Sequence, residues 1–166
     1  MSEKPDLKDL ARIGRTHPEL AERLKGRTEI LSAVEEPPRR RDAHAHHILL
    51  NMFDHQRRQS IVAVIDAEQQ KVVDVRRTKI QFQLSDRERE EAERIAADDA
   101  RVRAHLAGRS MNALTRLYFP TRGGTPENRH AIVFIRPSKS ERWYAIVDLT
   151  AGTTVDVLSR RRLAGD

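Results

Sequence analysis

Residues 61–75 of the chain read IVAVIDAEQQKVVDV, and residues 143–157 read WYAIVDLTAGTTVDV. The second stretch begins 82 positions after the first. In each, an apolar run ends at an aspartate, a short turn follows, and Val-Asp-Val opens a second run. Such runs separated by turn residues are typical of two antiparallel strands. The pattern therefore predicts the same β-hairpin twice.

The similarity extends beyond the hairpins at almost the same offset. Similarity at a fixed period indicates that a structural unit has been duplicated. We therefore expect two tandem copies, residues 1–84 and 85–166. The further matches are Arg12-Ile13 with Arg94-Ile95, Leu24 with Leu106, Gly26-Arg27 with Gly108-Arg109, and His47 with His130 after a difference of one residue.

The first copy is predicted to begin with a helix over residues 6–25. Pro18 should interrupt this helix, because proline lacks a backbone donor and clashes with the preceding turn. Thr16 and Glu19 have the spacing of a capping box that would restart it. Strands are expected at 29–35, 46–53 and 60–66, and a fourth from Lys71 as far as Leu84.

The second copy repeats this order. Ser85 and Glu88 predict a capping box at the start of its helix, and Asp98 or Asp99 is expected to cap a second helical piece. Strands are expected at 111–119, 130–136, 142–148 and 153–158.

The predicted fold class is α+β, with a helix packed on an antiparallel sheet of up to four strands in each copy. Residues 61–65 and 143–147 are apolar on both strand faces. One helix covers one face of a sheet, so we expect the second face to need cover from the other copy or from a partner chain.

The order of these motifs resembles the small N-terminal domains of copper amine oxidases. The resemblance rests on residues 93–109 (ERIAADDARVRAHLAGR), 129–134 (RHAIVF) and 143–157, with weaker versions at 11–27 and 62–75. It implies tandem cystatin-like units that are not catalytic and that act as accessory domains. The implied partner is a protein, either an amine-oxidase-like chain or a second copy of this one.

We expect no enzymatic activity. The oxidase family forms its topaquinone cofactor from a tyrosine in an Asn-Tyr-acidic motif, but Tyr118 and Tyr144 lie in Leu-Tyr-Phe and Trp-Tyr-Ala. The catalytic domain is also absent from this chain, and no catalytic triad or nucleophile motif is evident. Asp66 and Asp148 are interpreted as turn-opening residues that bond to the backbone.

Composition sets further expectations. The absence of cysteine excludes disulfides and thiolate metal sites. A net charge of +6 favours acidic partners in general. The N-terminal segment MSEKPDLKDL has no apolar core of a secretory signal. No stretch approaches the roughly 20 apolar residues of a membrane-spanning helix. We therefore expect a cytoplasmic protein with no membrane contact.

Three candidate sites remain. His44, His46 and His55 are candidate ligands for copper or zinc, since His-x-His places two imidazoles on one strand face. No bound cofactor is otherwise expected. Trp143 and Tyr144 are candidate partner-binding residues, because adjacent residues in a strand face opposite sides and one ring is expected in the core. Arginine clusters at 39–41, 57–58, 76–77 and 160–162 leave weak nucleic-acid binding as a second alternative, although no nucleic-acid motif accompanies them.

Overall fold

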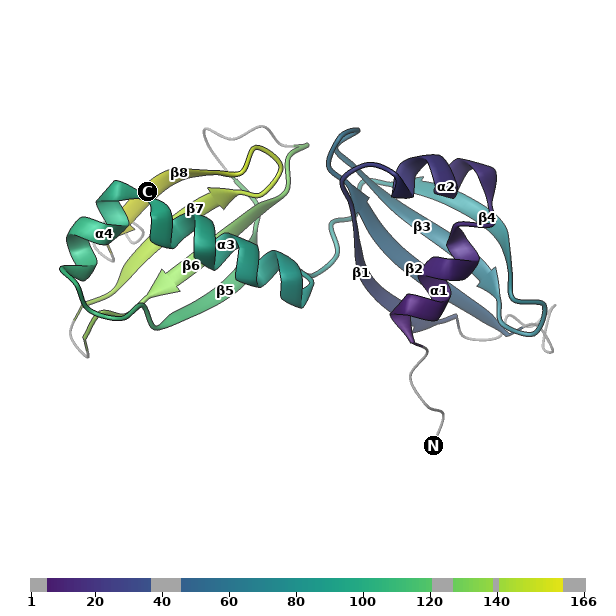
Figure 1. Cartoon of the computed structure of the whole chain (residues 1–166), viewed down its shortest axis with the longest axis horizontal. Coiled ribbons are helices and arrows are strands. Elements are labelled where there is room, and N and C mark those ends of the chain that lie inside the picture. Colours follow the sequence, from purple (N-terminus) through teal and green to yellow (C-terminus); the bar gives the residue numbers. More distant parts are fainter. Residues whose placement is uncertain (1–5, 37–45, 121–126, 139–140, 160–166) are drawn as a thin grey trace. The chain divides into compact units, whose positions relative to one another are not determined.

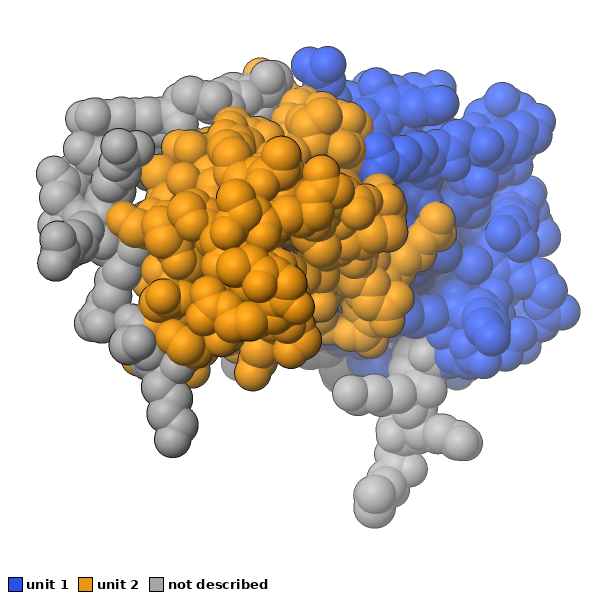
Figure 2. Space-filling model, turned by 60° about the vertical axis from the view of Figure 1, so that its left-hand side comes forward, with its two compact units in different colours: residues 1–82 blue, residues 83–166 orange. Residues whose placement is uncertain are grey.

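The computed structural model describes residues 6–36, 46–120, 127–138 and 141–159. The chain is an α+β protein that divides into two compact units, Met1–Phe82 and Gln83–Asp166 (Figure 1, Figure 2). Each unit has two short helices followed by a four-stranded antiparallel sheet, and the strands pair in sequence order. This repeated order is consistent with two tandem copies.

In the first unit, both helices lie over one face of the sheet (Figure 1). The core between them is formed by apolar side chains that alternate along the strands with residues of the opposite face. Leu20, Leu50 and Ile61 in this core are fully buried. The elements are α1 (Leu7–Gly14), α2 (Pro18–Leu24), β1 (Thr28–Glu35), β2 (His47–Asp54), β3 (Gln59–Asp66) and β4 (Lys71–Thr78).

The break between α1 and α2 falls at Pro18, as the sequence predicts, but the predicted capping box is wrong. Pro18 occupies the first turn of α2, where its missing donor has no helical partner to lose. His17 precedes it without a side-chain cap. The Thr16 hydroxyl instead donates to the Ile13 carbonyl at 2.7 Å. It therefore helps to close the end of α1 rather than to begin α2.

The second unit has a longer first helix and the same layers. Its core has fully buried side chains from the helices and from the facing sheet surface, such as Ala92, Ala131 and Val147. The elements are α3 (Asp86–Asp98), α4 (Ala100–Leu106), β5 (Ala113–Tyr118), β6 (His130–Ile135), β7 (Trp143–Asp148) and β8 (Thr153–Ser159).

Both predicted helix starts in the second unit are confirmed. Ser85 and Glu88 form a reciprocal capping box at the start of α3. Asp99, rather than Asp98, caps α4 by accepting a hydrogen bond from the Arg101 backbone at 2.8 Å. The predicted extension of the fourth strand to Leu84 is wrong. β4 ends at Thr78, and the Leu84 side chain is buried in the core of the second unit.

A buried ion pair joins α3 to the sheet in the second unit. Arg129, just before β6, is 0% exposed and makes two hydrogen bonds to the Glu88 carboxylate, the longer of them 2.8 Å. Arg129 also donates to the Gln83 carbonyl at 2.9 Å. In the first unit, Asp9 stands at the same position relative to the helix cap but forms an exposed pair with Arg12. The buried pair of that unit joins α2 to β2 instead, with Arg23 3.3 Å from Asp54.

The sheets share an irregularity as well as an order. The pairing of β3 with β4 shifts between Val64 and Ile65, and the pairing of β7 with β8 shifts between Ile146 and Val147. These positions are 82 residues apart, as the quoted hairpins are. The first sheet has a further shift between Ile30 and Ser32 that the second sheet lacks. From Ser32 onward, residues on the two sheets can be compared position by position.

Candidate functional site

A row of apolar side chains crosses the second sheet on the face opposite its helices. Odd-numbered residues of β6 and β7 point into the core, so even-numbered residues point to the other face. Leu114 pairs with Phe134, Phe134 with Tyr144, and Tyr144 with Leu158. These four residues, one from each strand, are called the apolar row below.

The row combines packed rings with exposed apolar surface. Phe134 and Tyr144 meet edge to face, with ring centroids 5.2 Å apart and an interplanar angle of 76°. Leu114 is 49% exposed, although it is a large apolar residue. A cavity of about 240 Å³ adjoins these three side chains. Exposed apolar side chains that gather around a hollow are typical of an interaction surface.

Two arginines flank the cavity. Arg136 directly follows β6, Arg142 directly precedes β7, and both are exposed and line the cavity. Neither guanidinium forms an ion pair with a carboxylate among the residues that the structure describes. Glu141, beside Arg142 in the chain, is paired instead with Arg109 at 3.0 Å. The flanks of the cavity are therefore positively charged.

The first sheet has different residues at the corresponding row. Asn51 there donates to the Ser32 hydroxyl at 3.0 Å, so two of its members satisfy each other. Its members pair across the four strands as those of the apolar row do. Ser32, Asn51, Val62 and Arg76 stand where the second sheet has Leu114, Phe134, Tyr144 and Leu158.

In the row next to the apolar row, the two central residues are aliphatic in both sheets. Leu49 pairs with Val64 in the first sheet, and Ile132 pairs with Ile146 in the second. Both pairs are aliphatic. The change from a mostly polar row to an apolar row is therefore not shared by the central pair of the neighbouring row.

The two aromatic residues predicted as partner-binding take different places. Trp143 packs against the core and stacks on His105 of α4, with ring centroids 3.5 Å apart and 16° between planes. Tyr144 lies on the opposite face in the apolar row. The expectation that the two rings face opposite sides is confirmed, and only Tyr144 offers its side chain to the row.

His46 and His55, the two described histidines of the predicted metal site, are not brought together. His44 lies outside the described residues. His46 comes just before β2, and His55 just after it. The eight-residue strand between them puts nine residue steps between His46 and His55, about 30 Å at the usual rise per residue. One ion therefore cannot bind both, and the three-histidine site is wrong as a single centre.

Within the described part of the chain, no group of three or more His, Cys, Asp or Glu side chains has the arrangement of a metal site. Asp66 and Asp148 act in their turns, as predicted. Asp66 accepts from the backbone of Glu68 and Gln69 at 2.9 Å. Asp148 accepts from the Ala151 backbone at 2.8 Å. Both carboxylates therefore have a structural task.

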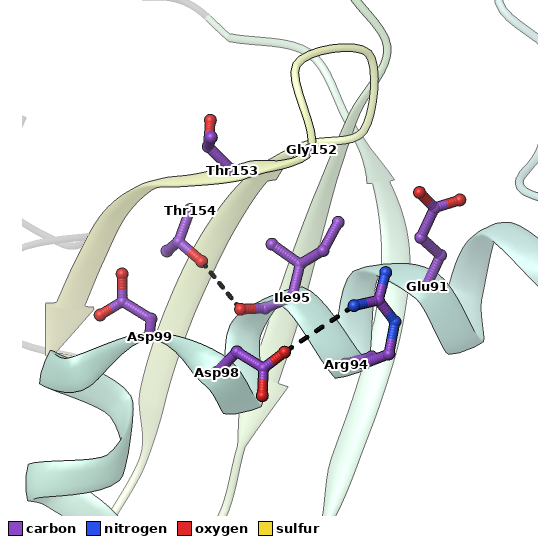
Figure 3. Close-up of a pocket in the computed structure, with 8 residues that line it drawn as sticks. All are labelled: Glu91, Arg94, Ile95, Asp98, Asp99, Gly152, Thr153 and Thr154. Carbon is purple, nitrogen blue, oxygen red and sulfur yellow. Dashed lines mark hydrogen bonds and ion pairs between the residues drawn. The ribbon is translucent and has the colours of Figure 1, made fainter.

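A second hollow, of about 370 Å³, lies between α3 and the β7–β8 turn (Figure 3). Several of its polar groups already have partners within the unit. Arg94 pairs with Asp98 at 3.8 Å, and the Thr154 hydroxyl donates to the Ile95 carbonyl. Asp99 is bound by the Arg101 side chain, and this hydrogen bond holds the pKa of Asp99 below its usual range. The hollow is best explained as helix-to-sheet packing.

Most arginines of the described clusters are paired with carboxylates. Arg57 bonds Asp54 at 3.0 Å, and Arg76 bonds Asp74 at 2.6 Å. Arg77 lies 3.8 Å from Glu19. Residues 39–41 and 160–162 lie outside the described residues. The described clusters therefore do not form an open cationic track.

Sequence reasoning found Tyr144 but missed the rest of the apolar row and its flanking arginines. Single positions such as Leu114 resemble ordinary strand residues. The available signal was the difference between the copies once their strands are aligned: Asn51 against Phe134, and Val62 against Tyr144.

No protein-family model matches the chain, and no curated protein is similar enough to be identified as a relative. Among the residues that the structure describes, no helix is long and apolar enough to cross a membrane.

Proposed function

We propose that this chain is a non-catalytic protein-interaction module, and that the apolar row is its binding surface. The observation that carries the proposal is the exchange of a mostly polar row for an apolar one on otherwise similar sheets. An exposed leucine next to a hollow contributes little to folding, because its surface stays in water. The same side chain contributes to binding when a partner covers it, at roughly 25 cal/mol per Å² of apolar surface buried.

The resemblance to cystatin-like N-terminal domains of copper amine oxidases supports an accessory role. In both, a helical layer packs on a four-stranded antiparallel sheet, twice in tandem. That architecture leaves one sheet face and two sheet edges for contacts. The partner is then another protein, with an amine-oxidase-like chain or a second copy of this chain as the first candidates.

The test exchanges the row for its counterpart in the same protein. The row-swap variant carries the first sheet's residues on the second sheet, so each new residue comes from a comparable strand position. Its substitutions are Leu114→Ser, Phe134→Asn, Tyr144→Val and Leu158→Arg. Val34→Ser serves as the matched control, because Val34 is a 53%-exposed apolar residue of the first sheet.

Affinity capture from lysate identifies partners, and binding is then measured with the purified partner by calorimetry. We expect the row-swap variant to lose binding and Val34→Ser to keep it. Tyr144→Ala alone is expected to weaken binding about 30-fold, the effect of losing a 2 kcal/mol aromatic anchor. Should the row swap disturb folding, Leu114→Ser provides a milder change at a half-exposed site. Equal binding by every correctly folded variant would contradict the proposal.

A further inference from the structure

We infer that the apolar row binds an acidic protein segment that inserts one large apolar side chain into the cavity and places carboxylates beside Arg136 and Arg142. This inference rests on the proposed function and specifies the chemistry of the partner.

The cavity is suited to a side chain. Its volume of about 240 Å³ lies below the roughly 300–1,000 Å³ of ordinary small-molecule sites. The side chains of Leu114, Phe134 and Tyr144 line it with apolar and aromatic surface. An aromatic or leucine anchor from a partner is the type of group that fills such a hollow at protein interfaces.

The charges around the cavity select the sign of the partner. Arg136 and Arg142 line the cavity, and Arg116 is a further exposed arginine on the same sheet face. The carboxylate next in the chain to Arg142, Glu141, is committed to Arg109. Asp156, which pairs with Ile146 in the neighbouring row, is the acidic residue of this face on β8. Carboxylates on a partner therefore meet an excess of arginine, which can bind them in a bidentate geometry.

The same charges argue against a second copy of the chain. A two-fold interface places one surface patch against the same patch of the partner. Arg136 and Arg142 would then approach the same arginines of the second copy. Like charges across an interface weaken association. An acidic partner avoids this repulsion, and its carboxylates are attracted by the same arginines.

Nucleic acid is a poorer match to the row. Single-stranded nucleic acid binds by stacking its bases on open aromatic faces along a basic groove. Phe134 and Tyr144 contact each other edge to face, and Leu114 and Leu158 stand on either side of them in the row. The arrangement presents one apolar anchor site rather than a series of stacking platforms.

The experiment selects ligands from a displayed library of random short peptides, with the full-length chain as bait. We expect enriched peptides to combine one large apolar residue with flanking Asp or Glu. A synthetic peptide from that pool is then measured by fluorescence polarisation. Arg136→Glu combined with Arg142→Glu should weaken it by about tenfold or more. Arg103→Glu, an exposed charge reversal on α4, is the matched control and should change little.

A peptide with its acidic residues changed to lysine supplies a reciprocal test, since the arginine-reversed chain should bind it better than the wild-type chain does. Binding should also weaken as salt rises, because exposed charges are screened.

The outcomes separate the two proposals. Peptides that require the apolar row but show no acidic preference would overturn the acidic partner and leave the interaction surface intact. If the library contains no peptide whose binding depends on the row, the present inference is wrong. The proposed function is then still tested by affinity capture with the wild-type chain and the row-swap variant. If a labelled poly-dT strand binds the row more tightly than the peptides do, the inference is wrong and nucleic acid is the ligand. If sedimentation shows a dimer that the row-swap variant does not form, the inference is wrong and the partner is a second copy of the chain.

Discussion

Changing Glu88 to glutamine should remove the charge of the buried ion pair with Arg129, together with one of the two oxygens that accept from the guanidinium. Glutamine keeps the size of the side chain and is also a good residue for a capping box, so the contact with Ser85 is retained. The substitution removes one negative charge beside a guanidinium that is fully buried. Arg129 then keeps its hydrogen bond to the Gln83 carbonyl but loses its counter-ion.

The expected loss is about 3–5 kcal/mol, the usual cost of leaving a buried charge without its partner. A unit the size of Gln83–Asp166 has a stability of about 4–13 kcal/mol at typical values per residue. Glu88→Gln therefore removes a large share of the stability of the second unit. Combining it with Arg129→Met should recover part of the loss, because no unpaired charge remains buried.

Trp143 provides the assay. It is the sole tryptophan of the chain and packs against the core of the second unit. Its fluorescence during urea denaturation therefore reports on that unit, and the shift of the midpoint gives the change in free energy of unfolding. Asp9→Asn is the matched control, because it removes a carboxylate at the same cap position from an exposed pair. Exposed pairs contribute about 0–1 kcal/mol.

A loss below about 1 kcal/mol for Glu88→Gln would refute this reasoning. Such a result would mean that water reaches the guanidinium. A double variant no more stable than Glu88→Gln alone would also contradict it, since the unpaired charge would then not be the cause.

Three further predictions concern the turns, the cap and metal. Gln70 and Gly152 occupy the same hairpin position with φ of 50° and 71°, so Gln70→Gly should stabilise and Gly152→Gln destabilise by about 1 kcal/mol each, measured by denaturation. The Arg101 hydrogen bond lowers the pKa of Asp99 in the folded chain. The contribution of this hydrogen bond to the stability of the fold should therefore be complete above the ordinary aspartate pKa and lost as pH falls through the lowered pKa of Asp99. Asp99→Asn should accordingly differ from wild type in thermal unfolding at neutral pH but not in strong acid. In zinc or copper titrations by calorimetry, His46→Ala and His55→Ala should change metal binding independently of each other. Loss of the same tight site in both variants would contradict the distance between the two histidines.

Much of the fold follows from local sequence signals. The eight strands and the division of each helical region appear in the pattern of apolar residues, because alternation and helical spacing are local properties. The capping box of Ser85 and Glu88 is equally local. The error at Thr16 arose because a capping box needs the hydroxyl oxygen to accept from the Glu19 backbone N–H. The Thr16 hydroxyl instead points back and donates to the Ile13 carbonyl at the end of α1.

The candidate site could not be found in the same way, because it depends on pairing across strands. Leu114 and Leu158 lie on opposite edges of the sheet, and only the register through Phe134 and Tyr144 places them in one row. The histidine hypothesis failed for a related reason. Close spacing in sequence does not imply proximity when an extended strand separates the residues, as it does His46 and His55.

The two sheets provide an internal comparison that bears on function. On the helix side, positions 82 residues apart stay apolar, as with Leu20 and Val102 or Ile65 and Val147. Packing constrains these positions in both units. On the other side, Asn51 and Phe134 differ in chemistry although each sits in the second strand of its sheet.

Stability alone does not explain that difference. Leu114 remains 49% exposed, so much of its apolar surface gains nothing when the unit folds. Arg136 and Arg142 likewise form no ion pair among the described residues, so they add no visible stabilisation. Apolar and cationic groups that contribute little within their own unit gain free energy when another molecule covers them. The face that differs most between the copies is therefore where a partner is expected to bind.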